Sequence, residues 1–215
     1  YKRFKIMNGA SEFIDTLGED YVIKIDGLMG GKGVKVSGEH LHSKEEALIY
    51  CKQLVDGSGT YIIEEKIFGE EFSLMSFCDG RRLAHMPAVQ DHKRAYEGDV
   101  GPNTGGMGAY SPTPIFSQIM QQKVHNKIML PIIRAMQQEE RVYKGILYAG
   151  LMLTKSGPQI LEFNARFGDP ETQPLLVRMK SDIIPIFEAC IDGTLDQCQL
   201  EWKKAVSYTH LTLPT

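Results

Sequence analysis

The sequence contains no hydrophobic run that approaches the roughly 18 residues of a membrane-spanning helix, and no sustained run of lysine and arginine. Its net charge of −3 gives no electrostatic reason to expect nucleic acid or a membrane surface as a partner. The 4 cysteines form no Cys-x-x-Cys pair, which disfavours a zinc site and a disulfide framework and favours reduced thiols. From these absences we expect a cytoplasmic protein.

The sequence also lacks an initiator methionine, a signal peptide, internal repeats and low-complexity segments. We therefore expect a segment of a longer protein. Its 215 residues are 42% hydrophobic and 24% charged and include 21 glycines, which is ordinary for an α/β protein. A chain of this length supports one sizeable hydrophobic core or two small ones.

Alternation of apolar residues predicts strands at 21–25, 34–36, 60–65, 72–77, 147–153 and 159–164. Helical spacing predicts helices from the capping box Ser43-x-x-Glu46 to Gly57, across 117–140 with a kink at Pro131, and at 183–190. The polar, glycine-rich stretch 87–114 shows little periodicity. A loop of that length is uncommon in a compact domain unless it is functional.

The end of the strand at 159–164 carries oxygen ligands. On an extended strand Ile160, Glu162 and Asn164 share a face, and the residues between them take the other. A carboxylate and an amide oxygen suit Mg²⁺ that carries nucleotide phosphates, because phosphates and waters fill its other positions. Arg166 follows, with a planar fork that suits a carboxylate or phosphoryl group. The alternative is an exposed strand end with an ordinary glutamate and arginine. Glu171, in the loop beyond, is expected to matter less than Glu162.

A second candidate is the glycine-rich loop 27–33, which contains Lys32 and follows Lys24 on its strand. Glycines let backbone amides approach phosphate oxygens, and a lysine supplies a point charge. The loop lacks the Ser or Thr of a P-loop and the G-x-G-x-x-G spacing, and it leads into a strand. A plain hairpin loop is the alternative.

Two further polar clusters stand out. The segment 62–72 carries four carboxylates next to Gly69, a plausible hinge, and could bind an adenine edge and ribose hydroxyls; the alternative is a solvated charged turn. Residues 91–94 combine both charge signs. His92 has no cysteine or histidine at ligand spacing, so substrate contact or a surface turn is expected there in place of zinc.

Taken in order, these features resemble the ATP-grasp fold, in which two α/β subdomains clasp ATP between them. More narrowly, Asp-His-Lys-Arg at 91–94, Gly-Pro-Asn-Thr-Gly-Gly-Met-Gly-Ala-Tyr-Ser at 101–111 and Arg-Phe-Gly-Asp-Pro-Glu-Thr-Gln at 166–173 closely resemble the phosphoribosylamine-glycine ligase family. The resemblance runs from about residue 21 to residue 205.

The resemblance implies an α+β fold with a small lid subdomain at 1–66 and a large subdomain at 67–206 that holds the metal and substrate site. The family has an N-terminal Rossmann-like domain and a C-terminal domain that this chain does not include. Residues 207–215 depart from the family pattern, are typical of a translated cloning sequence, and are left out of the expected fold.

Residue roles follow from the resemblance. The implied ATP-binding residues are Lys24 and Lys32 at the phosphates, the backbone at Glu65, Lys66 and Ile67 at the adenine, Glu71 at the ribose, and Glu64, to which no separate role is given. The implied ligands of Mg²⁺ or Mn²⁺ are Glu162 and Asn164, and the implied catalytic residues are Arg166, Asp169 and Lys32. The implied substrate residues are Asp91, His92, Lys93, Arg94, Asn103, Gly105 and Gly106.

The family joins glycine to 5-phosphoribosylamine with ATP, through glycyl phosphate, and gives glycinamide ribonucleotide, ADP and phosphate in purine biosynthesis. The resemblance therefore implies ATP as cofactor and glycine and 5-phosphoribosylamine as small-molecule partners. Two alternatives stay open: a nucleotide-binding module without ligase activity, and another ATP-grasp enzyme such as a carboxylase. The run at 166–173 argues against the carboxylase.

Overall fold

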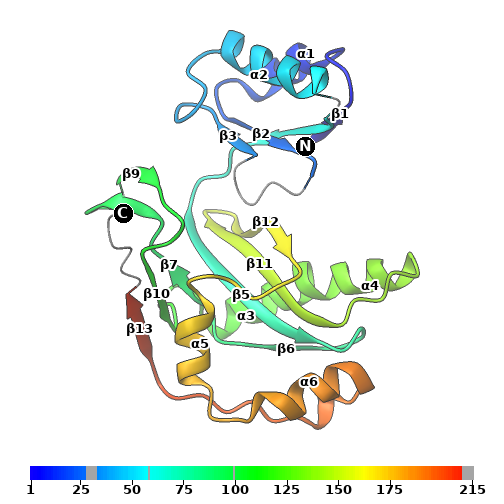
Figure 1. The fold of residues 1–215 in the computed structure, drawn as a ribbon, viewed down its shortest axis with the longest axis vertical. Coiled ribbons are helices and arrows are strands. Elements are labelled where there is room, and N and C mark those ends of the chain that lie inside the picture. The colour runs from blue at the N-terminus through cyan, green and yellow to red at the C-terminus, as the bar shows by residue number, and fades with distance from the viewer. Residues whose placement is uncertain (28–32, 58, 99, 210–215) are drawn as a thin grey trace. The chain divides into compact units, whose positions relative to one another are not determined.

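The structure, a computed structural model, describes residues 1–27, 33–57, 59–98 and 100–209, without the side chains of 102 and 103. The chain divides into two compact units, Tyr1–Phe68 and Gly69–Thr215 (Figure 1). The roles that the sequence assigns to 1–66 and 67–206 stay predictions.

The first unit is a sheet covered by helices. Its strands are β1 (Lys2–Phe4), β2 (Tyr21–Ile25), β3 (Val34–Val36) and β4 (Tyr61–Glu65), and its helices are α1 (Ala10–Leu17) and α2 (Lys44–Asp56). The strands pair antiparallel in the order β1-β4-β2-β3. Both helices pack on one core with Ile23, Tyr61 and Ile63.

Helix α2 begins and ends where the sequence predicts. Ser43 Oγ accepts a hydrogen bond from the backbone N–H of Glu46 at 3.2 Å. The Glu46 carboxylate caps the backbone N–H of His42, at 2.7 Å, one residue before the position expected of a capping box. Helix α1 was not predicted from the sequence, because it is short and Gly9 before it supplies no side-chain cap.

The second unit contains more elements. Its strands are β5 (Glu70–Cys78), β6 (Leu83–His85), β7 (Gln90–Asp91), β8 (Arg94–Tyr96), β9 (Val100–Asn103), β10 (Gly108–Ser111), β11 (Gly145–Thr154), β12 (Gly157–Asn164) and β13 (Val206–Thr209). Its helices are α3 (Gln118–Val124), the π-helix η1 (His125–Met129), α4 (Leu130–Gln138), α5 (Thr172–Arg178), α6 (Ile183–Asp192) and the 3₁₀-helix η2 (Leu195–Gln197).

The main sheet of this unit has the antiparallel order β12-β11-β5-β6 and helices on both faces (Figure 1). Phe72 and Leu74 of β5 face α3, η1 and α4. Met75 and Phe77 of the same strand face α5 and α6. The strand is therefore buried on both sides, which explains its almost unbroken burial.

The stretch 87–114 is not the structureless loop that the sequence suggests. It contains β7, β8, β9 and β10, each of 2 to 4 residues. Strands this short cannot show an alternating pattern, and glycine and proline interrupt them.

Strand β13 pairs antiparallel with β10, so the described residues of the excluded tail, 207–209, take part in a sheet. The segment before it is held by the buried Arg178, which donates to Lys203 O and Lys204 O at 3.0 Å and to Ser111 Oγ at 2.6 Å. That residues 207–215 are a translated cloning sequence stays a prediction.

The helix expected at 117–140 is interrupted. The π-helix η1 lies between α3 and α4 and ends two residues before Pro131, which occupies the first turn of α4. Proline has no backbone N–H and clashes with the preceding turn, so the chain changes its hydrogen-bond spacing just before it.

A β-bulge corrects one prediction about β12. Gly150 pairs with Glu162 whereas the next residue, Leu151, pairs with Ile160, so Leu161 is the extra residue. Ile160 consequently packs on the α4 side together with Phe163. The prediction that Ile160 shares a face with Glu162 is wrong, because the bulge shifts the alternation by one residue.

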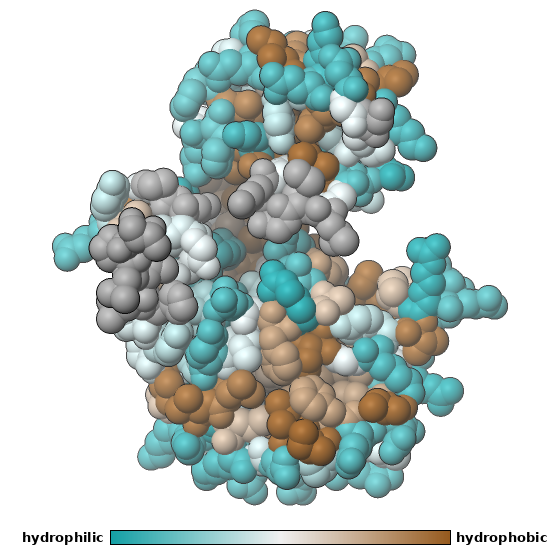
Figure 2. Space-filling model, viewed as in Figure 1, coloured by the Kyte–Doolittle hydropathy of each residue, from teal (hydrophilic) through white to brown (hydrophobic). Residues whose placement is uncertain are grey.

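Figure 2 shows apolar side chains on the outer surface of the second unit, over α5 and α6. They include Leu176, Val177, Ile184 and Ile191, which are 48–67% exposed. Among the described residues, no helix is long and apolar enough to cross a membrane.

Two histidines form a hydrogen-bonded pair between the main sheet and η1. His85 Nε2 lies 2.8 Å from His125 Nδ1, and His85 Nδ1 lies 2.6 Å from Ser76 Oγ. Burial, and then the neighbouring His125, lower the pKa of His85 from 6.5 to about 4. The unfolded chain therefore takes up a proton at His85 at a higher pH than the folded chain does.

We predict that this histidine makes the protein sensitive to acid. Its contribution to stability is complete above pH 6.5 and is lost progressively as the pH falls toward about 4, by up to about 3 kcal/mol. Urea unfolding at pH 7.5 and pH 5 measures the loss. His85→Gln should lower stability at both pH values but reduce the difference between them, whereas the exposed control His42→Gln should leave the difference unchanged. An equal pH dependence in His85→Gln and wild type would contradict this assignment.

Candidate active site

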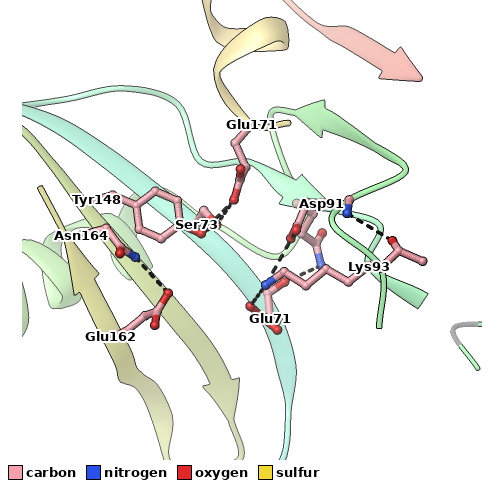
Figure 3. Close-up of polar contacts among 11 residues, drawn as sticks. Glu71, Ser73, Asp91, Lys93, Tyr148, Glu162, Asn164 and Glu171 are labelled. Atoms are coloured by element: carbon pink, nitrogen blue, oxygen red, sulfur yellow. Dashed lines mark hydrogen bonds and ion pairs between the residues drawn. The ribbon is translucent and has the colours of Figure 1, made fainter. Parts of the chain in front are cut away.

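Glu162 and Asn164 lie on one face of β12, as the sequence predicts. Asn164 Nδ2 donates a hydrogen bond to Glu162 Oε1 at 2.9 Å. Gly150, opposite Glu162 on β11, leaves room for this side chain, since a Cβ there would lie 3.3 Å from Glu162 Cγ. The carboxylate and the amide are therefore adjacent at the strand end (Figure 3).

Beside this pair on the same face lies a buried network of three side chains. Tyr148 Oη donates to Glu171 Oε1 at 2.8 Å, and Ser73 Oγ donates to the same oxygen at 3.1 Å. The two hydroxyls are themselves 2.7 Å apart (Figure 3). Glu171 is only 3% exposed. Burial first, and then the charge of Glu171, raise the pKa of Tyr148, so its hydroxyl remains a donor.

The run 166–173 needs its glycine to fit against this network. A Cβ on Gly168 would lie 2.5 Å from Glu171 Oε2 and 2.9 Å from Tyr148 Cε2. The backbone O of Gly168 also accepts hydrogen bonds from Thr172, at the start of α5. The sequence pattern places Glu171 in a loop and predicts no helix here, whereas α5 begins at Thr172.

Arg166 and Asp169 precede the buried glutamate in the run 166–173. The guanidinium carbon of Arg166 lies 5.8 Å from the centroid of the Tyr148 ring, and its Nη1 donates to Phe167 O at 2.8 Å. Asp169 Oδ1 accepts from Gln173 Nε2 at 2.8 Å. Both residues are exposed, so both can meet a ligand.

A second charged cluster joins β5 to the segment 91–94. Lys93 Nζ forms an ion pair with Glu71 and lies 3.7 Å from Asp91 Oδ2 (Figure 3). The Asp91 side chain is 5% exposed. Burial raises the pKa of Asp91 from 3.8 to about 6; Lys93 opposes this rise, and the charges of Glu171 and Glu71 add to it. For Lys93, burial opposes the charge, but Glu71 and Asp91 outweigh it and raise its pKa.

The two substrate loops predicted from the sequence contact each other. The backbone N–H of His92 donates to Gly108 O, that of Met107 to His92 O, and that of Thr104 to Lys93 O. The Arg94 guanidinium donates to Gly101 O at 3.0 Å.

The 101–108 loop also meets the 166–173 run. Gly106 has a φ of 109°, and a Cβ there would lie 2.5 Å from Pro170. Asn103 pairs with Arg94 through the backbone, and Gly105 is exposed.

The first unit holds the other predicted nucleotide residues. Lys24 of β2 forms an ion pair with Glu64 of β4, and Lys66 Nζ donates to Ser37 O at 2.9 Å. Glu65 is exposed and Ile67 half-buried. Lys32 lies outside the described residues.

The residues present suit a hard cation that also binds phosphate. In the described part of the chain, no group of three or more His, Cys, Asp or Glu could hold a metal ion by itself. Magnesium bound with nucleotide needs only one or two protein oxygens, and Glu162 with Asn164 offers that number. The orientation of the Asn164 amide, with its nitrogen toward Glu162, follows from this hydrogen bond.

Sequence analysis missed Ser73 and Tyr148. Both sit in strands that are largely apolar, 72–77 and 147–153, and a polar residue in such a run is a signal that could have been used. Their partner Glu171 lies about a hundred residues beyond Ser73, so only the fold brings them together.

These features define an ATP-grasp domain. At the level of fold alone, the structure is similar to biotin carboxylase from Campylobacter jejuni, solved as a complex with β,γ-ATP, with a TM-score of 0.65 at 13% identity over 93% of this chain and 43% of that one.

The chain belongs to the family described as phosphoribosylglycinamide synthetase, ATP-grasp (A) domain, whose model matches residues 1–172. This confirms the family-level resemblance. A phosphoribosylamine-glycine ligase from Halalkalibacterium halodurans is 47% identical over 208 residues, covering 94% of this chain and 47% of that protein. One from Methanobrevibacter smithii is 44% identical, covering 96% and 49%.

Among solved structures, phosphoribosylamine-glycine ligase from Thermotoga maritima matches with a TM-score of 0.79 and 34% identity, covering 89% of this chain and 49% of that one. The chain thus spans about half the length of these relatives.

We predict that Asp91→Asn stabilises the protein. Because the folded pKa of about 6 is above 3.8, the contribution of Asp91 to stability is full below pH 3.8 and is lost as the pH rises through 6. At pH 8 the ionised side chain should cost up to about 3 kcal/mol. Thermal unfolding should show a higher Tm for Asp91→Asn at pH 8 and a smaller gain at pH 5. The exposed control Asp20→Asn should show neither, and a lower Tm for Asp91→Asn at pH 8 would refute the prediction.

Proposed function

We propose that the chain is the ATP-binding and catalytic part of an enzyme that ligates glycine to 5-phosphoribosylamine, through glycyl phosphate, in purine biosynthesis. The observation that carries the proposal is the Glu162–Asn164 pair, which lies next to the 166–173 run in a chain 47% identical to such a ligase. The products are glycinamide ribonucleotide, ADP and phosphate.

We assign nucleotide binding to the residues that the family resemblance implies. Lys24 holds a phosphate, so its ion pair with Glu64 rearranges or is shared when ATP binds. Lys32 holds a second phosphate oxygen. Glu65, Lys66 and Ile67 border the adenine, and Glu71, steadied by Lys93, borders the ribose. Glu162 and Asn164 hold Mg²⁺ or Mn²⁺, which supplies charge neutralisation at the phosphates when bound.

A carboxylate is a poor electrophile, so glycine must first be activated. One carboxylate oxygen of glycine attacks the γ-phosphoryl group and ADP leaves. The amine of phosphoribosylamine then attacks the acyl carbon, loses a proton, and phosphate leaves. This chemistry demands positioning and charge neutralisation more than covalent help from the protein.

The residues around Glu171 are suited to position the carboxylate. Arg166 presents a planar fork of N–H donors, and its Nη1 donates to Phe167 O. Asp169 borders the amino group of a substrate. Asp91, His92, Lys93 and Arg94, with Asn103, Gly105 and Gly106, border glycine and phosphoribosylamine, since the two loops contact each other and the 166–173 run.

We predict that Glu162→Gln slows ligation by about 10²-fold to 10³-fold, equivalent to roughly 3 to 4 kcal/mol of barrier, because it removes charge from the metal site. The change is nearly isosteric at an exposed strand end, so the Tm should not move. Steady-state turnover against Mg²⁺ concentration, measured in this chain and in a chain extended to the length of its relatives, tests the assignment.

The matched control for this variant is Glu188→Gln, an exposed glutamate on α6 outside the site. Binding of Mn²⁺ in the presence of ADP, followed by electron paramagnetic resonance, separates metal loss from loss of chemistry. Wild-type turnover and metal dependence in Glu162→Gln would remove the metal assignment. Nucleotide binding without ligation in the extended chain would favour a binding module instead.

We predict that Lys24→Met weakens Mg-ATP binding about 10-fold to 100-fold, since a hydrogen bond to a charged group contributes about 1.5 to 3 kcal/mol. Isothermal titration calorimetry on this chain measures the change. Lys35→Met is the control, because Lys35 lies on β3, the strand next to that of Lys24, and its ammonium group is over the ring of Tyr50 in α2. Equal dissociation constants for wild type and Lys24→Met would exclude Lys24 from the phosphate site.

A further inference from the structure

Tyr148 contacts several parts of the candidate site at once. Its hydroxyl bonds to Ser73 and Glu171, and its ring lies under the Arg166 guanidinium. Its backbone pairs with Asn164 across the sheet. The side chain is 5% exposed, although it stands on a face with charged residues.

The ring and the hydroxyl have different partners. The distance of 5.8 Å from the ring centroid to Arg166 Cζ is within the range of a cation–π contact. Arg166 itself is exposed, and a long exposed side chain loses rotamer freedom when it binds a ligand. A ring beneath the guanidinium reduces that loss, because the fork is held before the ligand arrives.

The Tyr148 hydroxyl constrains the backbone of the run 166–173 through its hydrogen bond to Glu171. Glu171 follows Gly168 by one turn, and Gly168 approaches both Glu171 and Tyr148 too closely to carry a side chain. Ser73 and Tyr148 fix one oxygen of Glu171 and thereby the path of 166–171. The hydroxyl thus fixes the position of the Arg166 backbone, and the ring fixes the position of its guanidinium group.

We propose that Tyr148 is a positioning residue for carboxylate binding: its ring holds the Arg166 fork, and its hydroxyl, with Ser73, holds Glu171 and the loop that carries Arg166. The inference rests on the proposed function, in which Arg166 receives the carboxylate of glycine. This role of Tyr148 does not involve the nucleotide phosphates. Changes at Tyr148 should therefore alter the affinity for glycine and leave the affinity for nucleotide unchanged.

The test compares glycine and nucleotide affinity in the same variants. Glycine binding is measured by calorimetry with β,γ-methylene ATP and Mg²⁺ present, and analogue binding is measured separately. The variants are Tyr148→Phe, which keeps the ring, and Tyr148→Leu, which removes it. Both are made in this chain and in a chain extended to its relatives' length. Tyr143→Phe is the control, since its hydroxyl bonds to Ile146 O outside the site.

Tyr148→Leu should weaken glycine binding about 3-fold to 30-fold, the range of a partly desolvated cation–π contact. Tyr148→Phe should weaken it less than Tyr148→Leu does. The affinity for the ATP analogue should stay within about 2-fold in both variants. A residue needed only for folding would lower the active fraction and leave both dissociation constants unchanged.

A double-mutant cycle supplies the decisive comparison. In an Arg166→Ala background, Tyr148→Leu should have no further effect on glycine affinity. An undiminished effect there would overturn the proposal, as would equal glycine affinity in folded Tyr148→Leu and wild type. If Tyr148→Leu does not fold, Arg166→Lys replaces it: lysine keeps the charge but loses the planar group that lies on the ring. Unchanged glycine affinity in Arg166→Lys would then overturn the proposal.

Failure of the proposed function has a different signature. Suppose that wild type, at both chain lengths, binds no ATP analogue, or binds the analogue but no glycine. The proposed ligase function then fails, and this inference fails with it. If wild type binds both ligands, Arg166→Ala weakens glycine binding and folded Tyr148→Leu matches wild type, only the role of Tyr148 fails.

Discussion

The buried carboxylate of Glu171 is the interaction on which the candidate site depends. A buried carboxylate is tolerated only when hydrogen bonds replace its water, and here two hydroxyls from β5 and β11 bond to one of its oxygens. Strands far apart in sequence are thereby tied to the run 166–173. The close contact at Gly168 and the packing of Gly106 on Pro170 both require that run to be in place. Removal of this carboxylate would release more than a single side chain.

The neighbouring cluster of Glu71, Asp91 and Lys93 shows a cost that active sites commonly carry. Two carboxylates, of which only Asp91 is nearly buried, share one lysine, and a third is close enough to raise the pKa of Asp91. Such crowding of like charge lowers the stability of the folded chain. It also leaves the cluster ready to exchange an internal partner for a ligand, because the ligand relieves repulsion that is already present.

Much of the fold follows from the sequence, where the pattern is long enough to be periodic. The strands at 21–25 and 34–36 and the helix after Ser43 are confirmed, as are the strands at 147–153 and 159–164 and the helix at 183–190. Local patterns also gave the adjacency of Glu162 and Asn164. Short strands such as β7 carry too few residues to show a period. Ser73 and Tyr148 gain their meaning from a partner that only tertiary structure supplies. The bulge at Leu161 depends on pairing with β11, which no single strand encodes.

That bulge has a consequence for how the hairpin is built. In a regular strand, side chains alternate between the two faces without a break from the turn to the site. The core contacts near the turn would then dictate which way the final residues point. The extra residue at 161 resets the phase between Ile160 and Glu162. The half of β12 next to the turn can therefore pack its apolar residues on the α4 side of the sheet. The half next to the site can independently direct its oxygens to the other face. The hairpin works as two short segments of opposite phase, joined at one residue.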